Sequence, residues 1–252
     1  MNHRRQVLLG AGALGLTAVT GVAAWRQHRA APETTPIRSA PGFERLGVRG
    51  GISAASVLSI GLEPSTADAR TPLGPAALCQ ALFRAAGPGL KVAVFSDYFC
   101  PLCPRVGPLM AGIAAPLAIT WHEWPVLGPR SDFAARIGLA AARYAPAGTV
   151  HDTLMALRPR PSQVGATAAA AALGIAPGPV VAGLEDPAID DQLRRTDAVA
   201  WQLGLQGTPA FVVGRVVFSG LPSAALLRRL VRQERVRSSH MCGRSGAGDQ
   251  VR

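Results

Sequence analysis

Two cysteines separated by two residues, Cys100 and Cys103, are the side chains of this sequence with the clearest chemical use. They follow a short apolar run at residues 91–96, which predicts a buried strand, and we expect a helix to begin at Cys100. The first turn of a helix presents N–H groups that have no intrahelical partner, and these groups stabilise a thiolate. We therefore expect Cys100 to be a nucleophile and Cys103 to resolve the mixed disulfide that Cys100 forms.

The residues around the pair limit the reactions that we expect it to perform. Pro101 and Leu102 offer no charge or imidazole, so we expect the pKa of Cys100 in the middle of the span of about 3.5 to 7.5 known for such thiols. A structural disulfide and half of a metal site are alternatives, but a Gly-Thr-Pro sequence at residues 207–209 favours redox chemistry. A dithiol that binds a soft ion such as Cu(I) is an alternative from another class, and the lack of Met or His near the pair counts against it. We expect neither a metal nor a cofactor.

The other two cysteines are far apart in the sequence. Cys79 lies beside Leu78 and Leu82, and we expect it to be a small buried side chain rather than a reactive thiol. Cys242 lies in a basic C-terminal segment, where it either pairs with Cys79 or with another molecule or stays free.

Periodicity and turn residues predict the elements that hold the cysteine pair. The predicted order after a first helix is strand, helix, strand, helical insertion, hairpin and helix. A strand–helix–strand connection implies a right-handed parallel unit, and the hairpin adds antiparallel strands. The expected bounds are a helix at 75–86, strands at 91–96 and 117–124, an insertion at about 131–203, strands at 210–213 and 216–219, and a helix at 223–236.

This combination resembles the DsbA-like branch of the thioredoxin superfamily over residues 90–236. The residues that carry the resemblance are C-P-x-C after F-S-D-Y, the later G-T-P, and the helical insertion between them. The resemblance implies an α/β thioredoxin-like fold with a helical insertion and the activity of a thiol–disulfide oxidoreductase. It also implies that Pro209 is cis and faces the dithiol, and that Thr208 offers backbone groups to a bound substrate strand.

The sequence departs from this family at one position. Many relatives carry a buried acid six residues before the first cysteine, where it assists proton transfer at the second, and here that position is Val94. Asp97 either takes a similar role or faces solvent at the end of the strand. Glu123, at the end of the next strand, is a second candidate for a supporting acid.

The N-terminus has the pattern of an export signal. Arg4 and Arg5 precede an uncharged stretch at residues 7–25, which resembles a twin-arginine signal within residues 1–30. Small residues at 21–24 would permit cleavage, whereas the stretch is nearly long enough for an uncleaved anchor of about 20 apolar residues. Both outcomes stay open, and both place the chain outside the cytoplasm.

The rest of the chain divides by composition. Polar residues with proline predict a linker, a mixed segment predicts an N-terminal extension with one helix, and a Gly- and Ser-rich end predicts a disordered tail. The expected segments are the linker at 31–41, the extension at 42–89, the thioredoxin domain at 90–237 and the tail at 238–252.

The charge of the chain is concentrated at its ends. Of the formal net charge of +11, residues 1–30 carry +4 and residues 226–252 carry +5, which leaves +2 for everything between. A nucleic-acid-binding domain would place basic residues and aromatics together on the fold itself. The sequence therefore argues against a nucleic-acid partner.

Together these features predict a periplasmic enzyme, a dithiol oxidase that introduces disulfides into unfolded or newly exported thiol-containing proteins. A membrane redox partner would regenerate the Cys100–Cys103 disulfide. A disulfide isomerase or reductase of the same fold is the alternative. Isomerases usually need a dimerisation module, and residues 42–71 contain no convincing one, which favours the oxidase.

Overall fold

A six-stranded mixed sheet forms the centre of a computed structural model, which describes residues 32–47, 71–237 and 242. The strand order is β1-β2-β6-β5-β3-β4, with β3 and β4 parallel and β5 antiparallel to both β3 and β6. The strands are β1 (Thr34–Pro36), β2 (Glu44–Leu46), β3 (Leu90–Ser96), β4 (Leu117–Glu123), β5 (Ala210–Val213) and β6 (Val216–Ser219).

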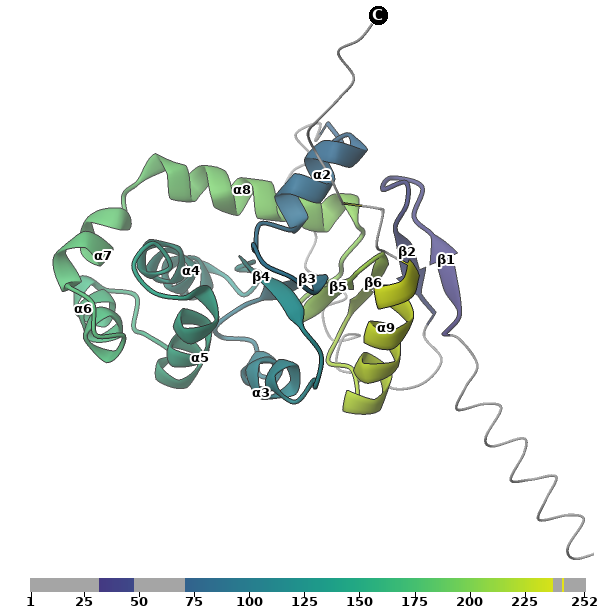
Figure 1. The fold of residues 1–252 in the computed structure, drawn as a ribbon. Coiled ribbons are helices and arrows are strands. Elements are labelled where there is room, and N and C mark those ends of the chain that lie inside the picture. Colours follow the sequence, from purple (N-terminus) through teal and green to yellow (C-terminus); the bar gives the residue numbers. More distant parts are fainter. Residues whose placement is uncertain (1–31, 48–70, 238–241, 243–252) are drawn as a thin grey trace, which may run out of the picture. The chain divides into compact units, whose positions relative to one another are not determined.

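Helices cover both faces of this sheet and extend beyond it (Figure 1). The helical elements are α2 (Pro75–Leu82), the 3₁₀ turn η2 (Cys103–Arg105), α3 (Val106–Ala111), α4 (Pro129–Ala141), α5 (Ala147–Leu157), α6 (Gln163–Ala172), α7 (Pro177–Gly183), α8 (Pro187–Gln202) and α9 (Ala224–Arg237). Helices α4 to α8 form the predicted insertion between β4 and β5. The fold is therefore the thioredoxin-like α/β fold with a helical insertion that the sequence predicts.

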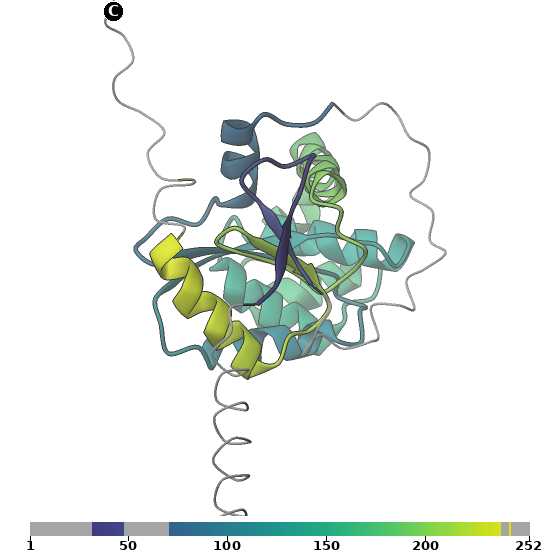
Figure 2. The same ribbon diagram turned by 90° about the vertical axis from the view of Figure 1, so that its right-hand side faces the viewer.

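Alternating side chains of β3 divide the core into two layers, as the twofold period of a strand requires. Val92 and Val94 pack with α3 and α9 on one face, whereas Ala93 and Phe95 pack with α2 and α8 on the other. Figure 2 shows the same arrangement from the side, with α9 and α2 on opposite faces of the sheet. A third cluster fills the helical insertion and includes both Cys100 and Cys103.

The segment expected to be a linker contains a strand instead. Residues of β1 pair antiparallel with β2, and Ile37 and Phe43 are buried beside them. The sequence Thr-Thr-Pro hides this strand because it lacks apolar alternation, and proline is tolerated on an edge strand, where no ladder bond is lost. The buried side chain of Gln202 fixes the segment further, since its amide donates to the backbone oxygens of Ser39 and Leu73.

The C-terminal segment is joined to α2 by a disulfide between Cys79 and Cys242. The sequence left the partner of Cys242 open, and in the structure that partner is Cys79 of the same chain. Cys79 was expected to be a free buried thiol, and it is a disulfide partner instead. The Lys91 ammonium also donates to the Cys242 carbonyl at 3.3 Å. The remaining residues of the expected tail, 238–241 and 243–252, lie outside the described residues.

The predicted export signal at residues 1–30 also lies outside the described residues. Within the described ranges, no helix is long and apolar enough to cross a membrane.

Candidate active site

Cys100 and Cys103 lie where β3 ends, but the local structure differs from the expected single helix. A turn follows Cys100, then the 3₁₀ turn η2 begins at Cys103, and α3 begins only at Val106. The Cys100 carbonyl accepts from the Cys103 N–H at 3.3 Å, a bond three residues apart rather than four. Proline at position 104 explains this difference, because it has no N–H to make the bond to Cys100 that an α-helix requires.

Both thiols are free, but neither is widely exposed. The Cys100 side chain is 4% exposed, and Cys103 is fully buried beneath it. The Cys100 thiol donates to the Thr208 carbonyl at 3.2 Å, which brings together two residues 108 positions apart. The Thr208–Pro209 peptide bond is cis, as the family resemblance implies. The dithiol and the Gly-Thr-Pro segment therefore meet at one place.

The surroundings of Cys100 favour its thiolate. The pKa of Cys100 is lowered to about 6, first by a hydrogen bond from Cys103, and then by the side chain of Thr208 and the backbone N–H groups of Leu102 and Cys103, while burial opposes the shift. The N–H groups are those expected to point at the sulfur, although they belong to a turn rather than to an α-helix. The value lies within the span expected from the sequence.

Cys103 has the opposite environment. Burial raises its pKa well above the ordinary value, and its hydrogen bond to Cys100 raises it further. The Ser96 hydroxyl and the Asp97 backbone lower it by a smaller amount. The pair thus combines an acidic thiol at Cys100 with a more deeply buried thiol at Cys103 that stays protonated.

Asp97 is buried and does not face solvent. One carboxylate oxygen accepts from the Phe99 N–H at 2.8 Å and from the Ser131 hydroxyl at 2.7 Å. The other accepts from the backbone N–H groups of Val126 and Leu127 at 2.9 and 3.1 Å. With four donors on two oxygens, Asp97 ties the turn before Cys100 to the loop that leads into α4.

Glu123, the second candidate acid, is buried in the same region. Its register partner on β3 is Ser96, and one of its carboxyl oxygens accepts from the Tyr98 hydroxyl at 2.7 Å. Its other oxygen has no hydrogen-bond partner among the described residues. Burial raises the pKa of Glu123 to about 8, and the charge of Asp97 adds to the shift although the Tyr98 bond opposes it. Val94, which occupies the position of the family's acid, is fully buried.

Sequence reasoning missed one residue that contacts Phe99, the neighbour of Cys100 in the sequence. The guanidinium carbon of Arg130, at the start of α4, lies 4.6 Å from the ring centroid of Phe99, the neighbour of Cys100. Cation–π contacts of this kind hold a positive charge over an aromatic face. The sequence indicates this contact only weakly, since it shows no more than that Arg130 follows Gly128 in the loop after the second predicted strand.

The chain belongs to the family described as the DSBA-like thioredoxin domain, whose model matches residues 91–232. The predicted family and fold are thereby confirmed, and the family is one of thiol–disulfide oxidoreductases. No curated protein sequence matches the chain.

Solved structures agree with this family. A thioredoxin-like oxidoreductase from Silicibacter pomeroyi is 29% identical with a TM-score of 0.56, covering 62% of this chain and 97% of that one. A periplasmic thioredoxin-like protein from Salmonella enterica serovar Typhimurium is 26% identical with a TM-score of 0.55, covering 62% and 95%. The thiol-disulfide exchange protein alpha-DsbA2 from Wolbachia pipientis, 20% identical with a TM-score of 0.55 and covering 61% and 90%, shares the fold.

Proposed function

We propose that the protein is a dithiol oxidase that passes a disulfide from Cys100 and Cys103 to other proteins. The observation that carries the proposal is the placement of the two thiols: Cys100 lies against the Thr208 carbonyl, Cys103 is fully buried, and these surroundings lower the pKa of Cys100 and raise that of Cys103. A stabilised Cys100 thiolate favours the reduced protein over its disulfide, and this makes the disulfide form a stronger oxidant.

The disulfide is transferred in two successive exchange steps. A substrate thiolate attacks the Cys100 sulfur of the disulfide, and the electron pair of the broken S–S bond goes to Cys103, which takes up a proton because its pKa is high. A second substrate thiolate then attacks the substrate sulfur of the mixed disulfide. Cys100 leaves as a thiolate, the substrate is oxidised by two electrons, and the enzyme is reduced by two.

Substrate is proposed to bind along the Thr208–Pro209 segment. Because the Thr208 carbonyl lies 3.2 Å from the Cys100 sulfur, an extended chain paired with this segment brings its own cysteine to Cys100. Leu127 belongs to the loop that Asp97 binds, and its 44% exposed side chain offers an apolar contact. Both features suit unfolded or newly exported proteins, whose backbone and apolar side chains are accessible.

Glu123 is proposed to supply and remove the proton of Cys103 in place of the acid that relatives carry at position 94. It is a buried carboxyl beside Ser96, whose hydroxyl favours the Cys103 thiolate. A pKa of about 8 allows the carboxyl to hold a proton at neutral pH and still release it. Asp97 is proposed to position the dithiol turn and not to exchange protons.

The proposed compartment is the periplasm. The twin-arginine-like pattern of residues 1–30 supports export, with residues 7–25 either cleaved or kept as an anchor, and one structural relative is a periplasmic protein. A membrane redox protein is proposed to re-oxidise the dithiol after each turnover.

Mixing the oxidised protein with a reduced, unfolded protein that has two cysteines tests the function. We expect one substrate disulfide to form for each Cys100–Cys103 disulfide consumed, with a Cys100→Ser variant inactive. If the protein instead only reshuffles disulfides that already exist, the isomerase alternative replaces this proposal.

A further inference from the structure

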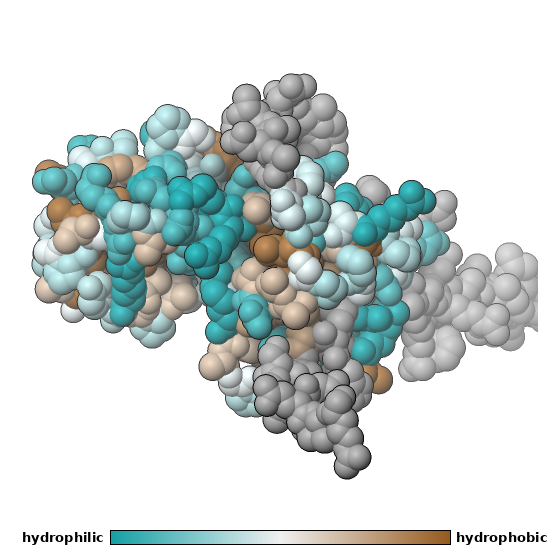
Figure 3. Space-filling view, turned by 90° about the horizontal axis from the view of Figure 1, so that it is seen from above, coloured by the Kyte–Doolittle hydropathy of each residue, from teal (hydrophilic) through white to brown (hydrophobic). Residues whose placement is uncertain are grey.

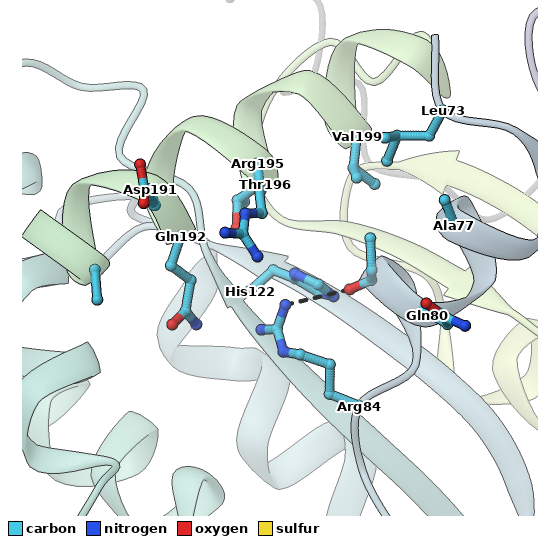
Figure 4. A pocket seen from close by; sticks show the side chains of 12 residues that line it. Leu73, Ala77, Gln80, Arg84, His122, Asp191, Gln192, Arg195, Thr196 and Val199 are labelled. Atoms are coloured by element: carbon cyan, nitrogen blue, oxygen red, sulfur yellow. Dashed lines mark hydrogen bonds between the residues drawn. The ribbon is translucent and has the colours of Figure 1, made fainter.

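A cavity of about 610 Å³ lies between α2 and α8, on the face of the sheet opposite to α3 and α9. Its volume falls within the range of about 300 to 1,000 Å³ typical of small-molecule sites. One wall is apolar, and the opposite part is polar (Figure 4). The exposed face of α8, seen from above in Figure 3, is mostly hydrophilic. Neither cysteine of the dithiol nor the Gly-Thr-Pro segment lines this cavity.

Two arginines give the cavity its positive charge. Arg84, just after α2, and Arg195, on α8, both line it, and they lie close enough that the charge of Arg195, after burial, lowers the pKa of Arg84. Arg84 also donates to the Ala81 carbonyl at 3.2 Å. Within the described ranges, neither guanidinium has a carboxylate at ion-pair distance.

The cavity's only lining carboxylate among the described residues is already engaged. Asp191 lies one turn before Arg195 on α8, and it accepts from Arg194 rather than from either cavity arginine. Two guanidinium groups facing each other across a cavity repel, and an oxyanion between them removes that repulsion. The planar N–H fork of arginine matches the oxygens of carboxylate and phosphate groups.

The buried ring of His122 is a further polar group of the cavity lining. Figure 4 shows the ring beside the guanidinium group of Arg84. Its Nε2 lies 3.0 Å from the Leu82 carbonyl, which only accepts, so the proton is on Nε2. Its buried Nδ1 therefore carries a lone pair, and no described residue donates to it. Burial lowers the pKa of His122 to about 3, so the ring is neutral and adds no third positive charge, and the two guanidinium groups are the charges that a ligand meets.

We infer that this cavity binds a phosphate group, whose oxygens accept hydrogen bonds from the guanidinium groups of Arg84 and Arg195. Free phosphate and the phosphate of a small monoester share this chemistry. The cavity is larger than the free ion, so an ester with a short organic part also fits beside Ala77 and Val199.

Calorimetric titration of the full chain in a buffer free of phosphate and sulfate tests this inference. The probes are inorganic phosphate, glycerol phosphate and chloride, which carries negative charge but has no pair of oxygens for a guanidinium fork. We expect both phosphate probes to bind more tightly than chloride, and the tighter of the two identifies the source as free ion or ester. Chloride binding as tight as that of phosphate would overturn the inference.

Two variants and a matched control locate the site. Arg84→Gln and Arg195→Gln should each weaken phosphate binding at least tenfold, because each removes a charged hydrogen-bonding partner. Arg232→Gln removes the same charge from an exposed position on α9 and should leave binding unchanged. Thiol–disulfide exchange by all three variants should match the wild type, which shows that they are folded. Equal binding by Arg84→Gln, Arg195→Gln and the wild type, or no binding by the wild type, would contradict the inference.

Discussion

Cys100 and Cys103 have identical side chains, and their surroundings give them opposite acidities. Hydrogen-bond donors gather at Cys100 and lower its pKa to about 6, whereas burial raises that of Cys103. The spacing of the pair and its place after a strand were enough to predict this asymmetry. The carbonyl of Thr208 as a partner of Cys100 follows from folding, because 108 residues separate the two.

Removal of Cys103 tests the assigned order of attack. Without a resolving thiol the mixed disulfide at Cys100 has no fast exit, so Cys103→Ala should accumulate disulfide-linked complexes with other proteins. Non-reducing gels of cells that express each variant measure this. The Cys79→Ala, Cys242→Ala double variant, which lacks the other cysteine pair, should show no such accumulation, and equal patterns would contradict the roles.

Glu123→Gln tests the proton route. In the wild type, disulfide transfer should slow as pH rises through about 8, where the folded carboxyl ionises and no longer donates a proton. The Gln variant should lose that limb of the pH profile, with transfer at pH 7 slower by roughly tenfold or more. An unchanged profile would leave Glu123 a structural role only.

The pH dependence of the free energy of unfolding gives a second test of Glu123. Glu123 has a folded pKa of about 8, above the ordinary value of about 4.3 for an unfolded chain. The unfolded chain loses this proton first, so the stabilisation present below about pH 4.3 is lost progressively as pH rises to about 8. Denaturant unfolding of Glu123→Gln should lack this part of the pH dependence.

The elements bring the site together at the carboxyl ends of β3 and β4. These strands are parallel and in register from Leu90 opposite Leu117 to Ser96 opposite Glu123, so their ends lie at the same edge. The strands and the insertion were predictable from apolar runs and turn residues. The contacts of Asp97 were not, because its partners at positions 126 and 127 are backbone N–H groups, which a sequence pattern does not display.

Asp97→Asn should weaken the link between the dithiol turn and the loop before α4. An amide nitrogen at one of the two positions faces N–H donors instead of accepting from them. We expect a loss of at least ~2 kcal/mol in the free energy of unfolding, measured with denaturant. The control is Asp132→Asn, since Asp132 is more exposed and forms an ion pair with Arg136, and it should cost less than ~1 kcal/mol. Similar losses in both variants would contradict the positioning role of Asp97.

At the scale of the whole molecule, one thioredoxin-like unit carries two separate cysteine pairs. The sequence predicted the fold and the family, because the C-x-x-C, the Gly-Thr-Pro and the insertion occur in a specific order. It left the pairing of Cys79 with Cys242 open, since 163 residues separate them and no local pattern connects them. It also missed the short strands β1 and β2, which pair with each other, and of which β2 also pairs with β6.

The Cys79–Cys242 disulfide should stabilise the protein without taking part in exchange. A cross-link over 163 residues restricts the unfolded chain strongly. Replacement of both cysteines by Ser should lower the free energy of unfolding by ~2–4 kcal/mol. Transfer of disulfides by Cys100 should keep its wild-type rate, and a large loss of transfer would show that the two pairs are coupled.

The reduction potential of the Cys100–Cys103 couple tests the proposed oxidase function most directly. Equilibration of the protein with glutathione buffers, with Cys79 and Cys242 replaced by Ser, measures it without interference from the second pair. Stabilisation of the Cys100 thiolate predicts a couple more oxidising than about −180 mV, toward the value of about −120 mV of strong oxidants. A potential at or below about −200 mV, toward the value of about −270 mV of reductases, would contradict the account.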